Sequence, residues 1–218
     1  LGVNITIISY GDSSDFLLKT LLGNIEIIPI YANKNKPKRS FQKALISIVW
    51  PILNYKRFNK IHVFKTNQVF GGWLPLILAA LNKKKLFVRL GYEPLQNSIK
   101  ANNRKLSLAL IWLTSFIVYR AADVILVTSP DIFNFIVGKY LVIKQKIKVK
   151  SNWVNTQLFN NDDSKANSVF TVLYVGRLSP EKNIDLLLNS CFDLNLKVII
   201  IGKGPEEYNL KKLACQLN

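Results

Sequence analysis

The sequence predicts an α/β fold with parallel sheets. Two runs of apolar and β-branched residues, 170–175 and 197–201, are separated by a segment in which Ile184, Leu187 and Leu188 recur at helical spacing. The second run leads into another helical segment, so strand, helix, strand and helix form a βαβα unit with parallel strands. With 49% hydrophobic residues among 218, the chain has ample material for a core, which excludes a disordered protein.

The region before this unit repeats the alternation of strands and helices. Short apolar runs predict strands at residues 1–9, 25–30, 61–66, 86–90, 124–128 and 147–150. The segments between them predict four helices: residues 41–58, a helix that follows the glycine pair 71–72 and runs through 81, residues 106–119, and a helix from 130 onwards. Pro51 is expected to kink or interrupt the first of these helices, because proline removes an intrahelical hydrogen bond. The apolar segment 106–119 is shorter than the ~20 residues that span a bilayer, so we expect a buried or interfacial helix.

Composition divides the chain into two domains. Residues 161–168 are rich in Asn, Asp, Ser and Lys, a composition typical of a linker. We therefore expect one domain over residues 1–160 and the start of a second over residues 169–218.

The loop after the strand 170–175 has the composition of an anion-binding site. Arg177 and Lys182 lie five residues apart, beside Gly176 and Ser179, and Ser179 is a typical helix N-cap when proline follows. Free backbone N–H groups and the positive end of a helix favour phosphate, and arginine offers it a planar pair of donors. From the spacing alone, two solvated cations on a surface loop explain the pattern equally well.

A second glycine-containing turn, with Gly202 and Gly204, follows the next strand. Ligands of parallel sheets bind beyond the carboxyl ends of the strands, so both turns are expected at one ligand site. A dinucleotide-binding oxidoreductase is excluded, because Glu207 replaces the third glycine of its fingerprint and would repel a pyrophosphate.

The segments VLYVGRLSPEKNIDLLL and IIIGKGPEE resemble the carboxyl-terminal domain of glycosyltransferase family 4, also called glycosyl transferases group 1. This resemblance implies a GT-B fold of two Rossmann-like domains, of which the amino-terminal start and most of the carboxyl-terminal domain are missing. It implies a retaining, metal-independent glycosyltransferase without cofactor, which moves a sugar from a UDP- or GDP-sugar to a lipid-linked or surface-glycan acceptor. Arg177 and Lys182 would bind the donor diphosphate and serve catalysis, and Gly176, Gly202 and Gly204 would line the donor site.

The acceptor side departs from the family pattern. Where the family has a histidine and a glycine, this chain has Gly91 and Tyr92, so we keep Arg89, Gly91, Tyr92 and Glu93 as acceptor-side candidates. Asn152 matches an interdomain asparagine of the family, although the acid that follows it there is Asn155 here. The family's glutamate pair would lie beyond Asn218.

The positive charge is concentrated in the front part of the chain. Residues 1–165 hold 24 Lys/Arg against 8 Asp/Glu, a net of +16, whereas residues 166–218 hold 6 against 5, a net of +1. Such a field attracts anionic lipid, nucleic acid or acidic glycans. The apolar helix around Trp50 has basic flanks, which suits either a membrane surface or a core helix with a solvated rim.

We therefore expect a cytoplasmic protein, peripheral at the inner face of the membrane, that acts in cell-surface polysaccharide biosynthesis. The alternatives are a basic nucleic-acid-binding protein and a catalytically idle, membrane-associated binding protein of the same fold. Nucleic acid is not the expected partner, because the aromatic residues lie mostly in apolar runs. No metal site is expected either: the chain has one histidine, and Cys191 and Cys215 lack metal-ligand spacing.

Overall fold

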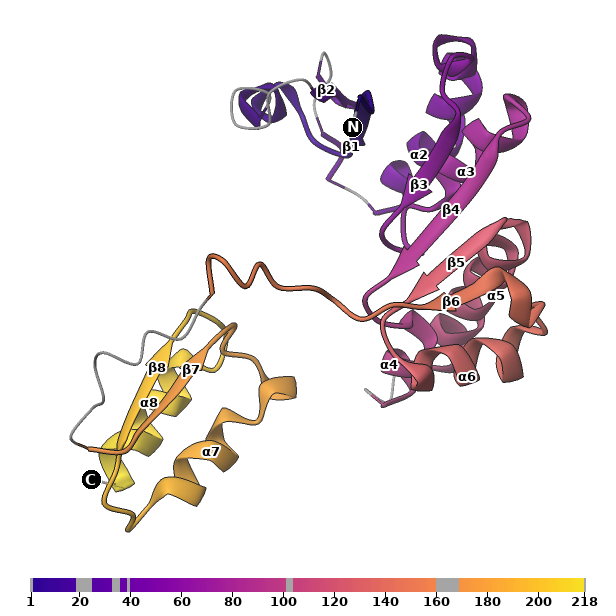
Figure 1. Cartoon of the computed structure of the whole chain (residues 1–218). Coiled ribbons are helices and arrows are strands. Elements are labelled where there is room, and N and C mark those ends of the chain that lie inside the picture. Colours follow the sequence, from indigo (N-terminus) through magenta and orange to yellow (C-terminus); the bar gives the residue numbers. More distant parts are fainter. Residues whose placement is uncertain are drawn as a thin grey trace. The chain divides into compact units, whose positions relative to one another are not determined.

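The computed structural model describes residues 2–18, 25–32, 36–38, 40–100, 104–159 and 169–217. The chain divides into two compact units, Leu1–Trp153 and Val154–Asn218, which we call unit 1 and unit 2 (Figure 1). The predicted linker 161–168 lies outside the described residues.

Unit 1 contains two parallel sheets. Strands β1 (Ile5–Ser9) and β2 (Ile25–Pro29) pair in one, with Ile5 opposite Ile25. The other has the order β3-β4-β5-β6, formed by β3 (Val63–Thr66), β4 (Lys85–Leu90), β5 (Val124–Val127) and β6 (Ile147–Val149). All of these strands are parallel, as predicted, because each neighbouring pair is joined through a helical segment.

Helical segments connect the strands of unit 1. They are η1 (Ser13–Leu17), α2 (Ser40–Asn54), η2 (Tyr55–Phe58), α3 (Trp73–Leu81), α4 (Pro94–Lys100), α5 (Lys105–Ala121), α6 (Pro130–Tyr140) and η3 (Lys144–Lys146). Helix α3 packs against β3 and β4, and α6 packs against β5 and β6. The core between helices and sheet includes Leu78, Val88, Val118, Ile125 and Ile136, all fully buried.

Helix α2 is not interrupted at Pro51, one of the two effects that were expected there. Helix α2 runs through Pro51 to Asn54, and only the last four residues of the predicted helix form a separate 3-10 turn. Pro51 is buried, and the side chain of Asn54 donates to the carbonyl oxygen of Trp50 (2.8 Å). Packing of the proline ring therefore outweighs the hydrogen bond that it removes.

Unit 2 is the predicted βαβα unit. Strands β7 (Thr171–Val175) and β8 (Lys197–Ile201) pair in parallel over their whole length, from Thr171 opposite Lys197 to Val175 opposite Ile201. The helical segments are η4 (Pro180–Lys182), α7 (Ile184–Cys191) and α8 (Glu207–Leu217). Leu178, Ile184 and Leu210 form the core of this unit, with Tyr174, Leu188 and Ile200 packed around them.

Candidate functional site

The turns that follow β7 and β8 are joined backbone to backbone. The N–H of Gly176 donates to the carbonyl oxygen of Ile201 (3.0 Å), and that of Leu178 donates to Lys203 (3.0 Å). The N–H of Glu206 in turn donates to the carbonyl oxygen of Leu178 (3.1 Å). These bonds fix the two turns at the carboxyl ends of neighbouring strands, where parallel sheets bind their ligands.

Gly202 and Gly204 allow the two turns to come this close. A Cβ atom on Gly202 would overlap the carbonyl oxygen of Gly176, and one on Gly204 would overlap the backbone of Leu178. Neither glycine has a positive φ, so the requirement comes from close approach and not from backbone conformation. Any side chain at these two positions would push the turns apart.

Arg177 combines a fixed backbone with an exposed side chain. The hydroxyl of Tyr174 donates to its carbonyl oxygen (3.0 Å), and the next residue, Leu178, is buried in the core of unit 2. The Arg177 guanidinium is exposed, as is the ammonium of Lys182 on the same loop. Within the described ranges, the ion pairs are Arg57–Glu26, Lys85–Asp123 and Lys211–Glu207, so both cations remain available to a ligand.

Ser179 precedes a helical turn with Pro180 at its first position, as expected, but this turn is a 3-10 helix and not the start of the α-helix. Pro180–Lys182 forms a single 3-10 turn, Asn183 adopts a left-handed conformation (φ 49°), and the α-helix begins only at Ile184. The buried Ser179 hydroxyl caps no backbone N–H and donates instead to the carboxylate of Glu181 (2.6 Å). The loop that carries the two cations is therefore a compact turn before α7, and not the first turn of a long helix.

The electrostatics of this turn place both cations near one carboxylate. The hydroxyl of Ser179, followed by a backbone hydrogen bond, holds the pKa of the exposed Glu181 carboxyl below its ordinary value. The positive charges of Arg177 and Lys182 lower the same pKa further. Both cations are thus close enough to Glu181 to interact with its charge, at the loop that follows β7.

Among the acceptor-side candidates, the structure brings Arg89 and Asn152 together. The guanidinium of Arg89, on β4, donates to the side-chain oxygen of Asn152 (2.9 Å) after β6. Gly91 lies just past the end of β4, and its carbonyl oxygen accepts a hydrogen bond from the hydroxyl of Thr128 (3.2 Å). These groups and the exposed Tyr92 lie at the carboxyl ends of the strands of unit 1.

Glu93, in contrast, points into the interior of unit 1 and is only 1% exposed. One carboxylate oxygen accepts hydrogen bonds from the hydroxyls of Tyr119 (3.2 Å) and Tyr140 (3.0 Å), and the other accepts from the N–H of Gln96 (2.6 Å). Burial raises the pKa of this carboxyl above its ordinary value. Glu93 therefore ties the start of α4 to α5 and α6, directly after the turn at Gly91 and Tyr92.

Sequence reasoning missed the residues that hold the site in place. Tyr174 fixes Arg177, and Tyr119 and Tyr140 fix Glu93, yet apolar periodicity identifies all three only as core positions. Asn183 did carry a signal, because asparagine is one of the few residues that tolerate a left-handed conformation before a helix.

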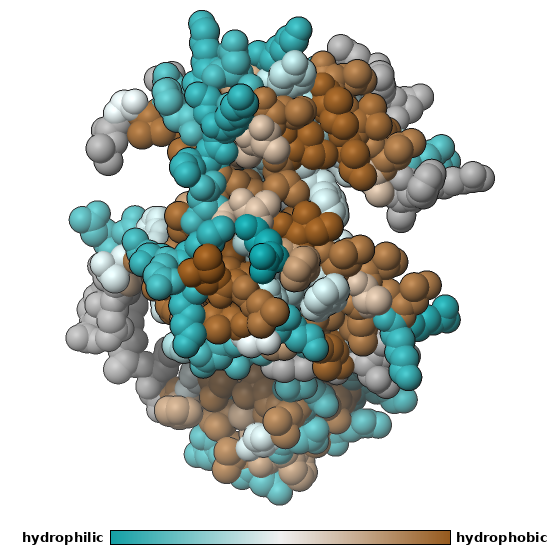
Figure 2. Space-filling model, turned by 90° about the vertical axis from the view of Figure 1, so that its right-hand side faces the viewer, coloured by the Kyte–Doolittle hydropathy of each residue, from teal (hydrophilic) through white to brown (hydrophobic). Residues whose placement is uncertain are grey.

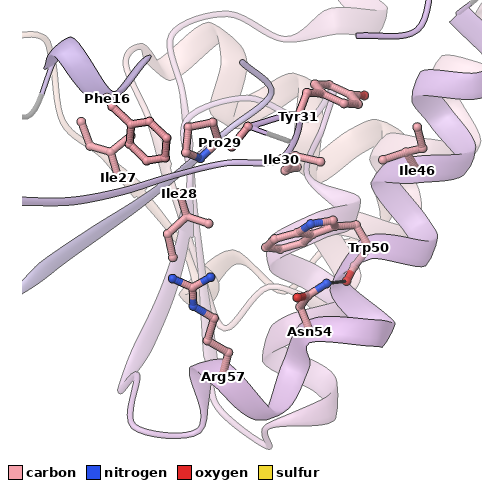
Figure 3. A pocket seen from close by; sticks show the side chains of 11 residues that line it. Phe16, Ile27, Ile28, Pro29, Ile30, Tyr31, Ile46, Trp50, Asn54 and Arg57 are labelled. Carbon is pink, nitrogen blue, oxygen red and sulfur yellow. Dashed lines mark hydrogen bonds between the residues drawn. The ribbon is translucent and has the colours of Figure 1, made fainter. Parts of the chain in front are cut away.

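A cavity of about 410 Å³ lies elsewhere, in unit 1 between β2 and α2, and none of the predicted site residues lines it. Figure 3 shows Ile46 and Trp50 pointing into it from α2, with Arg57 at one end. Trp50 also packs against Phe58, with ring centroids 6.0 Å apart. The tryptophan that suggested a membrane-facing helix is therefore turned inward.

Two further findings bear on metals and membranes. No group of three or more His, Cys, Asp or Glu side chains able to hold a metal ion occurs among the residues that the structure describes. In the same part of the chain, every helix is too short or too polar to cross a bilayer.

Comparison with known proteins confirms the resemblance seen in the sequence. A sequence model of the family "Glycosyl transferases group 1" matches residues 156–218, which include both turns of the site. No curated protein sequence matches the chain.

Solved structures of GT-B glycosyltransferases share the fold. HepE of Anabaena, determined in complex with UDP, superposes with a TM-score of 0.70 at 14% identity, over 97% of this chain and 57% of that one. A glycosyltransferase from Rickettsia africae gives 0.66 at 18% identity, over 99% and 57%. The lipopolysaccharide outer core galactosyltransferase WaaB gives 0.61 at 17% identity, over 91% and 52%. The chain thus has the predicted GT-B fold and spans about half the length of these structures.

Proposed function

We propose, from the match of residues 156–218 to the glycosyl transferases group 1 family and from the GT-B fold, that the protein is a retaining glycosyltransferase. It moves a sugar from a UDP- or GDP-sugar to a lipid-linked or surface-glycan acceptor. Unit 2 begins the donor-binding domain, and unit 1 is the acceptor-side domain. The observation that carries this proposal is the loop of Arg177 and Lys182, whose backbone is fixed while both cationic side chains stay exposed.

The two cations would act on the leaving group. As the bond between sugar and phosphate breaks, negative charge accumulates on the nucleoside diphosphate, and Arg177 and Lys182 would stabilise that charge. Because Tyr174 and the β8 turn already hold the loop, little reorganisation is needed at the moment of reaction. Gly176, Gly202 and Gly204 would line the donor site, and the close approach that Gly202 and Gly204 permit would hold the two turns together beside the diphosphate. Structures of HepE with UDP and with UDP-glucose support a nucleotide sugar as donor.

The proposed reaction needs neither a metal ion nor a cofactor. A metal ion in sugar transfer serves to neutralise the diphosphate, and two protein cations can supply the same charge. The Asp residues near the amino terminus are used locally: Asp12 accepts a hydrogen bond from the N–H of Ser14 (2.9 Å) and caps η1.

On the acceptor side, Arg89 and Asn152 would position the incoming group. The Asn152 oxygen occupies one donor of the Arg89 guanidinium and leaves others for an acceptor. Tyr92 would face the acceptor from the turn directly before Glu93.

We place the protein in the cytoplasm, at the inner face of the membrane, in cell-surface polysaccharide biosynthesis. The net charge of +16 over residues 1–165 supports this location, because a basic surface is attracted to anionic lipid.

The experiment that tests the function is sugar transfer by the protein to a lipid extract, with a panel of UDP- and GDP-hexoses as donors. We expect one donor to be consumed, and we expect NMR of the product to show the same anomeric configuration as the donor. Absence of transfer from every donor, together with absence of UDP and GDP binding, would overturn the proposal. A product with the opposite anomeric configuration would contradict the retaining mechanism but not the proposed glycosyl transfer.

A further inference from the structure

Helix α2 has two apolar sides. One side packs inward through Ile46, Ser47, Trp50 and Pro51. The other side carries exposed apolar residues at positions i, i+3, i+4, i+7 and i+8: Leu45, Ile48, Val49, Ile52 and Leu53. A surface helix normally directs polar residues to solvent, so this outer side lacks the expected pattern.

The outer side of α2 continues onto two neighbouring helices. Helix α3 packs against both α2 and α5, and its last residue, Leu81, is exposed. Helix α5 exposes Leu106, Leu110 and Leu113 at positions i, i+4 and i+7, together with Trp112. We call these exposed apolar residues of α2, α3 and α5 the apolar helical face.

An aromatic and basic row borders this face on α5. Trp112 stacks on Phe116 with ring centroids 5.1 Å apart, and the guanidinium of Arg120 lies 5.5 Å from the centre of the Phe116 ring. Tryptophan and arginine are amphipathic in the sense that an apolar body carries a polar tip, which suits a boundary between hydrocarbon and water.

Figure 2 shows apolar side chains gathered over the side of the molecule that lies to the right in Figure 1, where α3 and α5 are labelled. Ten large apolar side chains make up the apolar helical face: Leu45, Ile48, Val49, Ile52, Leu53, Leu81, Leu106, Leu110, Trp112 and Leu113. Exposed apolar side chains gathered on neighbouring helices mark a site for a protein partner or a membrane.

The charge around the face identifies the partner. Residues 27–122 contain 17 Lys/Arg and a single acid, Glu93, which is only 1% exposed. Basic side chains lie at the ends of the three helices: Lys56, Arg57 and Lys60 after α2, Lys83 and Lys84 after α3, Arg104 before α5, and Lys105 and Arg120 in its first and last turns. Of these cations Arg57 is paired with the exposed Glu26 (3.3 Å), and the others lie outside the ion pairs seen in the described residues. An apolar surface with a predominantly basic rim matches the headgroups and acyl chains of an anionic bilayer.

We propose that the apolar helical face docks unit 1 onto the surface of an anionic membrane, with the exposed side chains of α2, α3 and α5 entering the headgroup region and the flanking lysines and arginines contacting phosphate. The inference rests on the proposed function, because a lipid-linked acceptor lies in a membrane. It assigns the contact to three helices and excludes Trp50, which faces the cavity behind α2. Nucleic acid fits less well, since phosphate contacts do not require an apolar surface.

The test is flotation of the protein with vesicles of phosphatidylglycerol and phosphatidylcholine, compared with pure phosphatidylcholine. We expect binding to the anionic vesicles and weak binding to the neutral ones. The combined variant Leu45→Gln, Ile48→Gln, Ile52→Gln and Leu53→Gln should need at least about tenfold more lipid for half-maximal binding, because four apolar side chains no longer transfer from water into the membrane. Its matched control is Leu173→Gln with Leu186→Gln in unit 2, which are similarly exposed and should bind like the parent.

A second set of variants separates charge from apolar contact. Lys83→Gln, Lys84→Gln and Lys105→Gln should each weaken binding to anionic vesicles roughly fivefold, because a lysine near such a surface contributes about 1 kcal/mol. Lys197→Gln and Lys212→Gln in unit 2 serve as controls. High salt should reduce binding of the parent and have less effect on a variant that combines Lys83→Gln, Lys84→Gln and Lys105→Gln.

The outcomes distinguish this inference from the proposed function. Sugar transfer to a soluble acceptor without vesicle binding would overturn the docking surface and leave the function intact; vesicle binding without transfer from any donor would do the reverse. If the α2 variant binds vesicles like the parent, the assignment to this face is wrong. It is equally wrong if that variant instead converts a dimer to a monomer in sedimentation, or if a polynucleotide displaces the protein from vesicles.

Discussion

The two units carry their positive charge in different ways. Unit 1 has many cations around an apolar surface, with its one acid between residues 27 and 122 buried. Unit 2 is nearly neutral, yet two of its cations stand on one loop whose backbone is tied to the neighbouring turn. In unit 1, the net charge indicates only which class of partner is attracted. In unit 2, the fixed backbone of the loop indicates where a ligand would bind.

The same contrast appears in the carboxylates. Glu93 of unit 1 is enclosed and serves three hydrogen-bond donors, while Glu181 of unit 2 is exposed and lies among the cations. Substitutions at Glu93 should therefore lower the stability of unit 1, whereas substitutions near Glu181 should lower the affinity for a ligand.

The largest effect is expected from Glu93→Ala. It leaves the hydroxyls of Tyr119 and Tyr140 without their acceptor and opens a cavity, so unit 1 should lose about 3–5 kcal/mol of unfolding free energy, measured by urea denaturation. The control is Glu26→Ala, which removes an exposed ion pair with Arg57 and should change stability by less than about 1 kcal/mol. Equal losses of unfolding free energy in the two variants would show that the buried hydrogen bonds of Glu93 stabilise unit 1 no more than the exposed ion pair does.

Next in size are Arg177→Ala and Lys182→Ala. Each removes a charge-assisted hydrogen bond to phosphate of about 1.5–3 kcal/mol, so sugar transfer should fall roughly ten- to a hundredfold while the fold stays intact. More of the loss should appear in kcat than in donor binding, because charge develops as the bond breaks. Arg177→Lys should recover only part of the activity, and Lys203→Ala should have a milder effect. If both alanine variants transfer sugar at the rate of the parent protein, the assignment of Arg177 and Lys182 to the donor site is wrong.

A smaller effect concerns the pH dependence of stability. The pKa of Glu93 in the folded protein is raised above its ordinary value of 4.5, so in the window just above pH 4.5 the folded state binds more protons than the unfolded state. The unfolding free energy should therefore fall as pH rises through the folded pKa. Glu93→Gln cannot titrate and should lack this fall. If both proteins show the same pH profile, another group is responsible.

The smallest effect, none at all, is expected from chelation of divalent metals. The diphosphate already has two protein cations, so EDTA should leave the rate of sugar transfer unchanged. Loss of transfer that manganese or magnesium restores would contradict the proposed mechanism.

Much of the fold could be predicted from local sequence. Strand β8 begins and ends at the predicted residues, Lys197 and Ile201, because a run of β-branched residues is closed by Gly202. Ser179 does precede a helical turn, but serine followed by proline begins a 3-10 turn as readily as an α-helix. The left-handed Asn183 then separates this turn from α7. At Pro51 tertiary packing overrode the local preference.

The candidate site shows the same limit. Arg177 and Lys182 were predicted to bind the diphosphate from the family resemblance of the segment around them, because their spacing alone fits a solvated surface loop equally well. The need for Gly202 and Gly204 arises from contacts with the turn after β7, and the role of Glu93 arises from tyrosines on two other helices. Such long-range contacts leave no periodic signal in the chain.

The central claim, that Arg177 and Lys182 bind the diphosphate of the donor, is tested most directly by calorimetric titration with UDP and with uridine, or with GDP and guanosine. In the parent protein the diphosphate should make the nucleotide bind much more tightly than the nucleoside. In the double variant Arg177→Ala and Lys182→Ala, we predict that this difference shrinks at least tenfold while nucleoside binding is unchanged. An unchanged difference between nucleotide and nucleoside in that variant would contradict the claim.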